Sequence, residues 1–201
     1  MHHANRKQNH VMNAACALAT MGLGGLATHA NAGTLTDFRT VALSGQQAPD
    51  PDGGVTFARF SFPVINAVGQ TAFVSSLAGD NVISESNNIG LYSEGSGSLA
   101  QVARTGDQAP DAPDGVKFFG VSPPVLNKAG QIAFGSNLTG ADSPNTIYTG
   151  DSSGPLDRVA REGDPVPGES GVSFSGGGQN GPALNAAGQI AFTDALTGDD
   201  V

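Results

Sequence analysis

The chain has 201 residues and a formal net charge of −9, with 29 Gly, 12 Pro, one Cys and no Trp. This acidic balance argues against nucleic acid and anionic membrane surfaces as partners, because both carry the same sign of charge. Gly and Pro together stay below the fraction of about 25–30% at which disorder is favoured, so we expect a folded chain.

The first 32 residues have the features of a signal peptide. Arg6 and Lys7 give it a positive start, an apolar stretch runs from residue 14 to residue 27, and Ala30-Asn31-Ala32 offers small residues for cleavage before Gly33. A transmembrane anchor is the alternative, but the apolar stretch is shorter than the roughly 18–20 residues needed to cross a bilayer. We therefore expect an exported protein, located in the periplasm, at the cell surface or outside the cell, with no membrane span after signal cleavage.

Cleavage would remove Cys16 and all four His residues, so that the mature chain has neither thiol nor imidazole. It would leave seven basic and eighteen acidic residues, a formal charge of −11. Without thiols no disulfide can form, and the fold then depends on burial and strand pairing.

Residues 33–201 contain one pattern three times and are predicted to form a single repeat domain. The pattern combines Gly-x-x-x-Pro, Gly-Val-x-Phe and Pro-x-(Leu/Ile)-Asn-x-x-Gly-Gln-x-Ala-Phe, and its Asn recurs as Asn66, Asn127 and Asn185, at spacings of 61 and 58 residues. The approximate repeats are 44–104, 105–161 and 162–201. A fixed period of this length is typical of propeller blades or stacked arrays.

Each repeat is predicted to contain four short strands. In the first repeat these are Pro63–Asn66, Gln70–Leu77, Ile89–Glu94 and Leu99–Arg104, and a further strand, Phe38–Leu43, precedes them. The first two strands are joined by Asn66-Ala67-Val68-Gly69, where Asn can bond its own backbone and Gly can close the turn, so we expect a tight hairpin.

The second strand of each repeat is apolar on both faces, which predicts that each sheet is covered on both sides. We expect one layer between repeats to contain the Phe of each second strand and the opposite face to contain the preceding Ala. These residues are Phe73, Phe134 and Phe192, and Ala72, Ala133 and Ala191. The roughly twenty residues from Arg104 to Pro124 are expected to cross from one repeat to the next.

These features predict an all-β fold, an incomplete β-propeller-like array of four-stranded repeats with about two and a half blades. Propellers close with about four to eight blades. We therefore expect a chain truncated at its C-terminus, or one that completes itself by self-association through open sheet edges.

The sequence resembles the repeats of uncharacterised exported bacterial proteins. The resemblance covers residues 38–201 and rests on Val102-Ala103-Arg104-x-Gly106-Asp107-Gln108-Ala109-Pro110, Gly115-Val116-x-Phe118 and the Asn127-x-x-Gly130-Gln131-x-Ala133-Phe134 segment. Many such proteins carry a C-terminal sorting anchor, which we do not expect in this chain. The resemblance implies a secreted or surface-displayed propeller-like domain and provides no catalytic residue.

The positions that carry the same residue in all three repeats are interpreted as a structural motif. They are Asn66, Gly69, Phe73, Asn127, Gly130, Phe134, Asn185, Gly188 and Phe192. The favoured role of each Asn is to start a turn, because Gly follows three residues later in every copy. The alternative places the three Asn side chains in a ring around a central ligand.

Acidic loops offer weak candidates for a metal site. Asp80, Asn81 and Asp142 follow the second strands, and oxygen ligands of this kind suit Ca²⁺. The chain has no Asp-x-Asp-x-Asp-Gly loop. We therefore favour solvated turns over calcium, and we expect no cofactor.

Catalysis is disfavoured by composition. A mature chain without His or Cys lacks the usual nucleophile–base pairs and zinc ligands. Glycoside hydrolysis needs two carboxyls about 5–9.5 Å apart, and no such pair is indicated among Glu85, Glu94, Glu162 and Glu169. Arg104 and Arg161 are expected to pair at the surface with nearby carboxylates such as Asp107 and Asp164.

The sequence leaves three classes of function open. The favoured one is a noncatalytic surface or extracellular scaffold that presents variable loops, such as residues 79–88, to a protein or glycan partner. The others are part of a carbohydrate-active enzyme completed by blades outside this chain, and a Ca²⁺-stabilised binding module.

Overall fold

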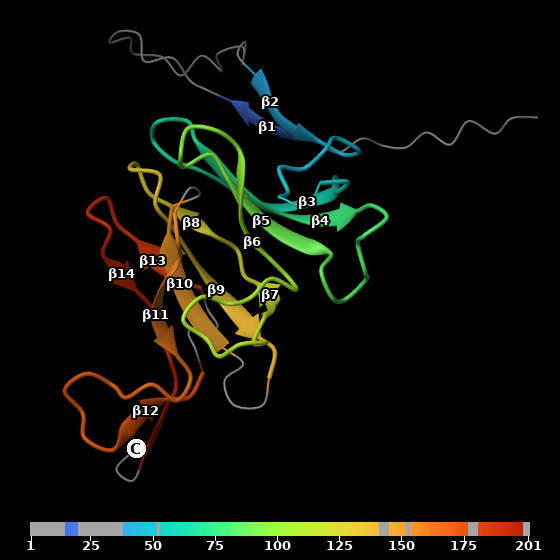
Figure 1. Ribbon diagram of the computed structural model, residues 1–201. Helices are drawn as coiled ribbons and strands as arrows, with labels where there is room; N and C mark the ends of the chain where they lie inside the picture. Colours follow the sequence, from blue (N-terminus) through green and yellow to red (C-terminus); the bar gives the residue numbers. More distant parts are fainter. Residues whose placement is uncertain are drawn as a thin grey trace, which may run out of the picture.

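The computed structural model describes residues 15–19, 38–51, 53–140, 145–151, 154–176 and 181–198. Within these ranges every regular element is a β-strand and every paired strand is antiparallel, so the prediction of an all-β chain is confirmed. The strands form several sheets, none of which closes on itself (Figure 1). None of the described residues forms a helix with the length and apolarity of a membrane span.

The first repeat forms a four-stranded sheet in sequence order. Its strands are β3 (Thr56–Ile65), β4 (Thr71–Ala78), β5 (Ile89–Ser93) and β6 (Ala100–Arg104). The predicted first strand, Pro63–Asn66, is too short, because β3 already begins at Thr56. A bulge between Ser61 and Val64 explains the difference: Phe62 has φ of 52° there, and such an interruption breaks the alternation that marks a strand.

The second repeat repeats this arrangement with a divided first strand. Its elements are β7 (Phe118–Val121), β8 (Val125–Leu126), β9 (Ile132–Leu138), β10 (Asn145–Gly150) and β11 (Asp157–Arg161). Both β7 and β8 pair with β9, so together they occupy the position of β3. β7 lies inside the segment predicted to cross between repeats, which shortens that crossing to residues 105–117.

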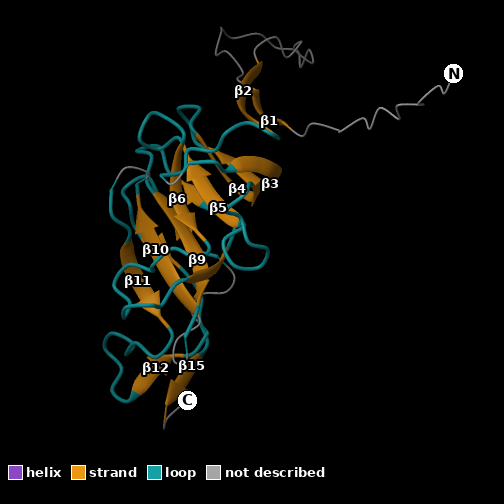
Figure 2. Cartoon of the chain, turned by 45° about the vertical axis from the view of Figure 1, so that its right-hand side comes forward, coloured by secondary structure: helices purple, strands orange, loops and turns teal. Residues whose placement is uncertain are grey.

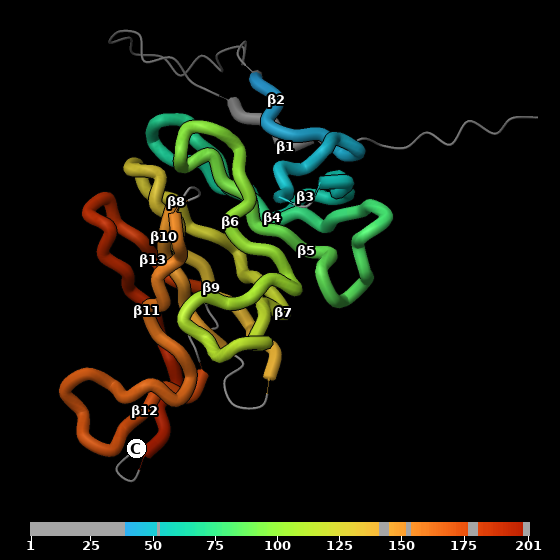
Figure 3. Tube along the Cα trace, in the orientation of Figure 1, coloured from blue at the N-terminus to red at the C-terminus, as the bar shows by residue number. Residues whose placement is uncertain are grey.

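The third repeat supplies two strand positions in the described residues. β12 (Val172–Phe174) pairs with β15 (Leu196–Gly198), and β13 (Ala183–Leu184) pairs with β14 (Ile190–Ala191). These pairs correspond to the first and second strands of the other repeats. The tube in Figure 3 shows the third repeat continuing past β11 and folding back alongside the second.

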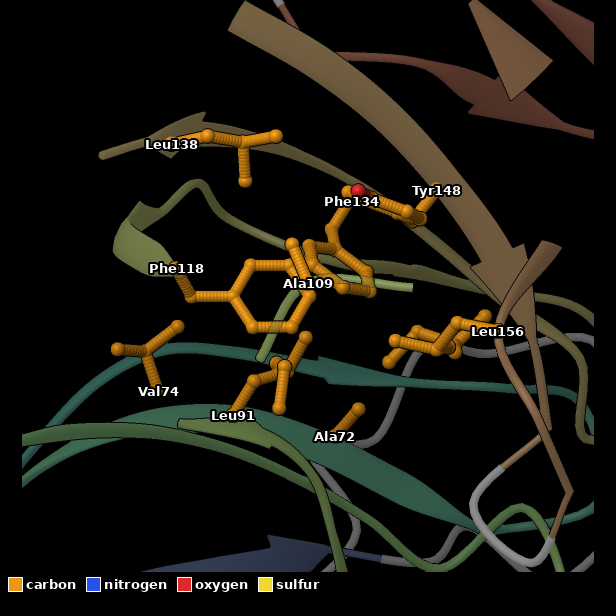
Figure 4. Close-up of a cluster of buried hydrophobic side chains, with 11 residues drawn as sticks. Ala72, Val74, Leu91, Ala109, Phe118, Phe134, Leu138, Tyr148 and Leu156 are labelled. Carbon is orange, nitrogen blue, oxygen red and sulfur yellow. The ribbon is translucent and has the colours of Figure 1, made fainter. Parts of the chain in front are cut away.

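The first two sheets pack face to face around a buried cluster, here called the inter-sheet core. The first sheet contributes the face that has no aromatic side chains, here called its small-residue face, with Ala72, Val74 and Leu91. The second sheet contributes its aromatic face, with Phe118, Phe134 and Tyr148. Figure 4 shows these side chains pointing toward one another from the two ribbons. Ala72, Leu91, Phe134 and Tyr148 are fully buried. Each large apolar side chain buried in this way contributes about 1.5–3 kcal/mol to folding.

A second buried cluster, the N-terminal core, covers the aromatic face of the first sheet. The rings of Phe57, Phe73 and Tyr92 meet there, and the centroids of Phe57 and Tyr92 lie 4.9 Å apart in an edge-to-face arrangement. Ala42, which is fully buried, packs against them from β2 (Phe38–Leu43). Phe73 and Ala72 therefore face opposite cores, so the first sheet has one aromatic and one small-residue face.

The strand β2 has the bounds expected from the sequence, and it pairs with β1 (Ala15–Ala19). β1 lies within residues 1–32, the segment predicted to be a signal peptide, and the other residues of that segment lie outside the described ranges. Cleavage before Gly33 would remove β1 and stays a prediction.

Candidate functional site

The repeated Asn organises the hairpin tip of each repeat. In the first repeat its Oδ1 accepts hydrogen bonds from the backbone N–H groups of Val68 and Gln70, at 3.1 and 3.0 Å. Asn127 and Asn185 make the same two bonds in their own turns. The side chain thus holds the turn closed by satisfying two backbone donors.

The amide nitrogens of the same residues link one repeat to the next. Nδ2 of Asn66 donates to Oε1 of Gln70 at 2.7 Å and to the backbone oxygen of Asn127 at 2.8 Å. Nδ2 of Asn127 likewise donates to Oε1 of Gln131 and, at 3.0 Å, to the backbone oxygen of Asn185. We call this series of contacts the asparagine ladder.

The asparagine ladder leaves Asn66 and Asn127 with no capacity to bind a central ligand. A side-chain amide offers two acceptor sites and two donors, and all four are used within the protein at both positions. Both residues are buried. Their roles in this structure are turn closure and contact between repeats.

Two glycines permit the hairpin tips to approach this closely. A Cβ atom on Gly95, in the turn between β5 and β6, would collide with the backbone oxygen of Gly130, and a Cβ on Gly130 would collide with that of Gly95. Gly130 also has φ of +85°, a conformation that disfavours other residues. The sequence pattern identified Gly130 as a turn residue but did not indicate that it contacts Gly95 of the preceding repeat.

A buried ion pair lies where the first repeat meets the segment after β2. Nη1 of Arg104 lies 2.5 Å from Oδ2 of Asp50, and the two side chains are only 6% and 1% exposed. Nε of Arg104 also donates to the backbone oxygen of Asn87. The expectation of a surface pair with Asp107 is therefore wrong: the partner lies 54 residues away, and Asp107 instead accepts a bond from Gln101.

Tyr92 lies close to this pair and is fully buried. Burial raises the pKa of its hydroxyl, and the negative charge of Asp50 adds to the effect, while Arg104 opposes it. Such a group stays protonated at all ordinary pH values and is a poor general base. The cluster therefore has a structural role, as the link between β6 and the loop that follows β2.

The second repeat carries a related but different set of contacts. The hydroxyl of Tyr148 donates to the backbone oxygen of Pro110 at 3.1 Å, and burial raises the pKa of Tyr148 to about 12. Asp164 pairs with Arg158 at 3.5 Å and accepts a bond from the backbone N–H of Arg161. The expected pairing of the Arg161 side chain with Asp164 is thus replaced by one from Arg158.

Glu94, one of the carboxylates considered for catalysis, is engaged in an ion pair and several hydrogen bonds. Glu94 binds the guanidinium of Arg39 through both oxygens, at 2.7 and 2.5 Å, and accepts bonds from the hydroxyl and backbone N–H of Thr71. Burial opposes ionisation of Glu94, but these bonds outweigh it and hold its pKa below the usual value of 4.5. A carboxylate held in this form by four donors joins β2 to the first sheet and is unsuited to proton transfer.

The calcium candidates do not gather into a site in the part of the chain that the structure describes. Asp80 and Asn81 are exposed in the loop after β4, and the backbone oxygen of Asn81 accepts a bond from Asn87. Asp142 lies outside the described residues. Within the described ranges, no three Asp, Glu, His or Cys residues are close enough together to hold a metal ion.

The most promising binding surface is a hollow between the first two repeats, here called the loop hollow. It is lined by Glu85, Asn88 and Ile89 of the first repeat and by Phe119 of β7, with a volume of about 370 Å³. The ring of Phe119 is 60% exposed, and Ile83 in the same loop is 64% exposed. Exposed large apolar side chains beside polar groups are typical of recognition surfaces.

The loop that forms one wall of this hollow is fixed by its own hydrogen bonds. Oδ1 of Asn88 accepts a bond from the backbone N–H of Glu85, and Oδ1 of Asn87 accepts one from that of Ile83. Glu85 has φ of 61°, which turns the chain sharply at this point. The sequence indicated a variable loop at residues 79–88, but Phe119 could not be assigned to it because the residue belongs to the next repeat.

A family model matches residues 23–150 and 141–201 of this chain. The chain belongs to the family of unknown function DUF7453. Comparison of this DUF7453 chain with curated proteins and with solved structures gave no match. Membership adds no activity, because the family itself has no assigned function.

Proposed function

We propose that this DUF7453 chain is an exported, noncatalytic binding scaffold whose repeats are the blades of a propeller-like array. Three copies of one pattern support this architecture, and so does the packing of the small-residue face of the first sheet against the aromatic face of the second. The apolar stretch and the small residues before Gly33 support export.

The binding surface of this scaffold is the loop hollow, and its ligand is a glycan. The observation that carries this proposal is the exposed ring of Phe119 beside the Glu85 carboxylate and the Asn88 amide. A sugar ring has an apolar face of C–H groups and a rim of hydroxyls. An exposed aromatic ring with one carboxylate and one amide matches both parts, as in sites that combine apolar contact with a few orienting polar groups.

Binding to a panel of immobilised oligosaccharides, including cell-wall, cellulose-type and chitin-type fragments, tests this proposal. We expect Phe119→Ser to weaken binding at least tenfold, a loss of about 1.4 kcal/mol, and Glu85→Gln to weaken it less. The matched control is Val159→Ser, which removes an exposed apolar residue from β11. A Phe119→Ser protein that binds as the unaltered chain does would contradict the proposed site, and binding only to proteins would replace glycan as the ligand class.

A further inference from the structure

The two ends of the described chain carry complementary parts of one repeat. The first and second repeats each have four strand positions, whereas in the described residues the third repeat fills only the first two. β2 has the sequence of a fourth strand, since Val41-Ala42-Leu43-Ser44-Gly45 corresponds to Val102-Ala103-Arg104-Thr105-Gly106. Figure 2 shows β2 and the β12–β15 pair at opposite ends of the molecule. β2 therefore does not complete the third repeat of its own chain.

The hydrogen bonds around β2 support its assignment as a fourth strand. The N–H of Gly45 donates to the backbone oxygen of Phe57 at 2.7 Å, and the N–H of Gly106 donates to that of Phe118 at 2.8 Å. The segment after β2 thus enters the first repeat in the same way as the segment after β6 enters the second.

The pairing of β2 with β1 has the same register as the pairing of β6 with β5. Ala42 is paired with Cys16, and Ala103 is paired with Leu91. In each case the register shifts directly after this pair, between Cys16 and Ala17 in β1 and between Leu91 and Tyr92 in β5. The backbone of β1 therefore holds the register of a third strand. Together, β1 and β2 correspond to the outer half of a repeat.

Two sheet faces that are covered inside the molecule are open at its ends. Ala72 and Ala133 are fully buried, whereas Ala191, at the same position of the third repeat, is exposed. At the other end, Ile65 is 50% exposed, whereas Leu126 at the same position of the second repeat packs against the inter-sheet core. The open face of the third repeat forms a hollow of about 400 Å³ that Ala191 helps to line.

The asparagine ladder also ends at these two faces. Asn185 uses one donor of its amide for Gln189, and its second donor has no partner among the described residues. The backbone oxygen of Asn127 accepts bonds from Gly130 and from Asn66, whereas that of Asn66 accepts only from Gly69 within the described ranges. One end of the ladder thus offers a donor, and the other offers an acceptor.

We infer that two copies of this chain associate head to tail, the third repeat of each copy receiving the first repeat of the other. The small face around Ala191 covers Ile65 of the partner copy, and Asn185 donates to the backbone oxygen of that copy's Asn66. β2 then occupies the fourth strand position beside the third repeat of the other copy, and β1 occupies the third position in a chain that retains it; within the described residues the third repeat fills neither position. This interface continues the one already present between repeats, with the same faces in the same order.

Such an association closes into a ring of two copies. An interface between two different surfaces generates a ring when its rotation closes. Two copies supply six repeats, which lies within the four to eight blades of closed propellers. Removal of β1 by signal cleavage would leave both faces, both ladder ends and β2 in place, so that the cleaved chain associates through the same surfaces.

Light scattering coupled to size-exclusion chromatography tests this inference on the 201-residue chain and on the chain beginning at Gly33. We expect a dimer for both at micromolar concentration. Ala191→Arg and Ile65→Arg each place a long charged side chain on an exposed position, and each should give a monomer that keeps the far-ultraviolet circular dichroism of the unaltered chain. Val159→Arg, on an exposed apolar position outside both faces, is the control and should remain dimeric.

A mixture of the two variants distinguishes head-to-tail from symmetric pairing. The Ala191→Arg chain keeps an intact first repeat and the Ile65→Arg chain keeps an intact third repeat, so one contact can form and the mixture should regain dimers. A monomeric unaltered chain, a dimer insensitive to both variants, or polymers longer than two copies would overturn the inference. Oligosaccharide binding is measured separately at Phe119, which lies on neither face, so its failure leaves this inference intact.

Discussion

Removal of the Asn127 side chain should destabilise the protein more than the equivalent change at Asn185. Asn127→Ala loses four hydrogen bonds at a buried position: two to its own turn, one to Gln131 and one to the next repeat. At about 0.5–1.5 kcal/mol for each bond, with water recovering part of the loss at the exposed turn, we expect a cost of about 3 kcal/mol. Asn185→Ala loses three bonds at an exposed position, and we expect about 1 kcal/mol.

Urea unfolding followed by far-ultraviolet circular dichroism measures both costs, provided that the slope of the transition is unchanged. Asn127→Asp refines the test, because it keeps the two turn acceptors and removes both donors. If the bond between repeats is what distinguishes the two sites, Asn127→Asp should remain clearly more destabilising than Asn185→Asp. Equal losses of stability at Asn127 and Asn185 would refute this explanation of the repeated Asn.

Three other perturbations test the polar contacts of the first two repeats. Arg104→Met leaves the charge of Asp50 buried without its partner and should cost about 3–5 kcal/mol in urea unfolding, whereas a double change of both residues to apolar ones should recover most of it; no recovery would argue against charge burial as the cause. Because the pKa of Glu94 is lowered on folding, its ionised form stabilises the protein above pH 4.5 and this contribution is lost as the pH falls below that value. Glu94→Gln should therefore flatten the acid limb of a melting-temperature profile, and a profile identical to that of the unaltered chain would contradict this. Tyr92 and Tyr148, the only tyrosines, have pKa values that are raised above 10 in the folded chain. Their protonated hydroxyls therefore contribute fully to the free energy of unfolding below pH 10, and this contribution is lost as the pH rises above that value. Phenolate absorbance should appear together with the loss of circular dichroism, and phenolate formation in a folded chain would show that the rings are accessible.

The parts of the fold that depend on short-range signals could be predicted from the sequence. Asn and Gly three residues apart indicated each hairpin, because both the Asx bonds and the positive φ of Gly act within four residues. The range of β2 was also correct. The start of β3 was missed, since the bulge at Phe62 followed by Pro63 divides the strand into two weak signals.

The contacts that were missed join residues far apart in the chain. The partner of Arg104 is 54 residues away, so the nearer Asp107 was the natural but wrong choice. The loop hollow combines a loop of one repeat with Phe119 of the next, and no pattern within a single repeat can show this. Sequence periodicity gives the unit and its spacing, whereas the contacts between units require their relative placement.

The alternation of an aromatic face with a small-residue face gives the array a direction. The boundary between the first two units joins the small-residue face of one to the aromatic face of the next, and the ladder bonds at both boundaries run in the same direction along the chain. A duplicated unit inserted between the first and the second would meet matching surfaces on both sides. Genes encoding this architecture can therefore lengthen or shorten by whole units without any new boundary having to evolve.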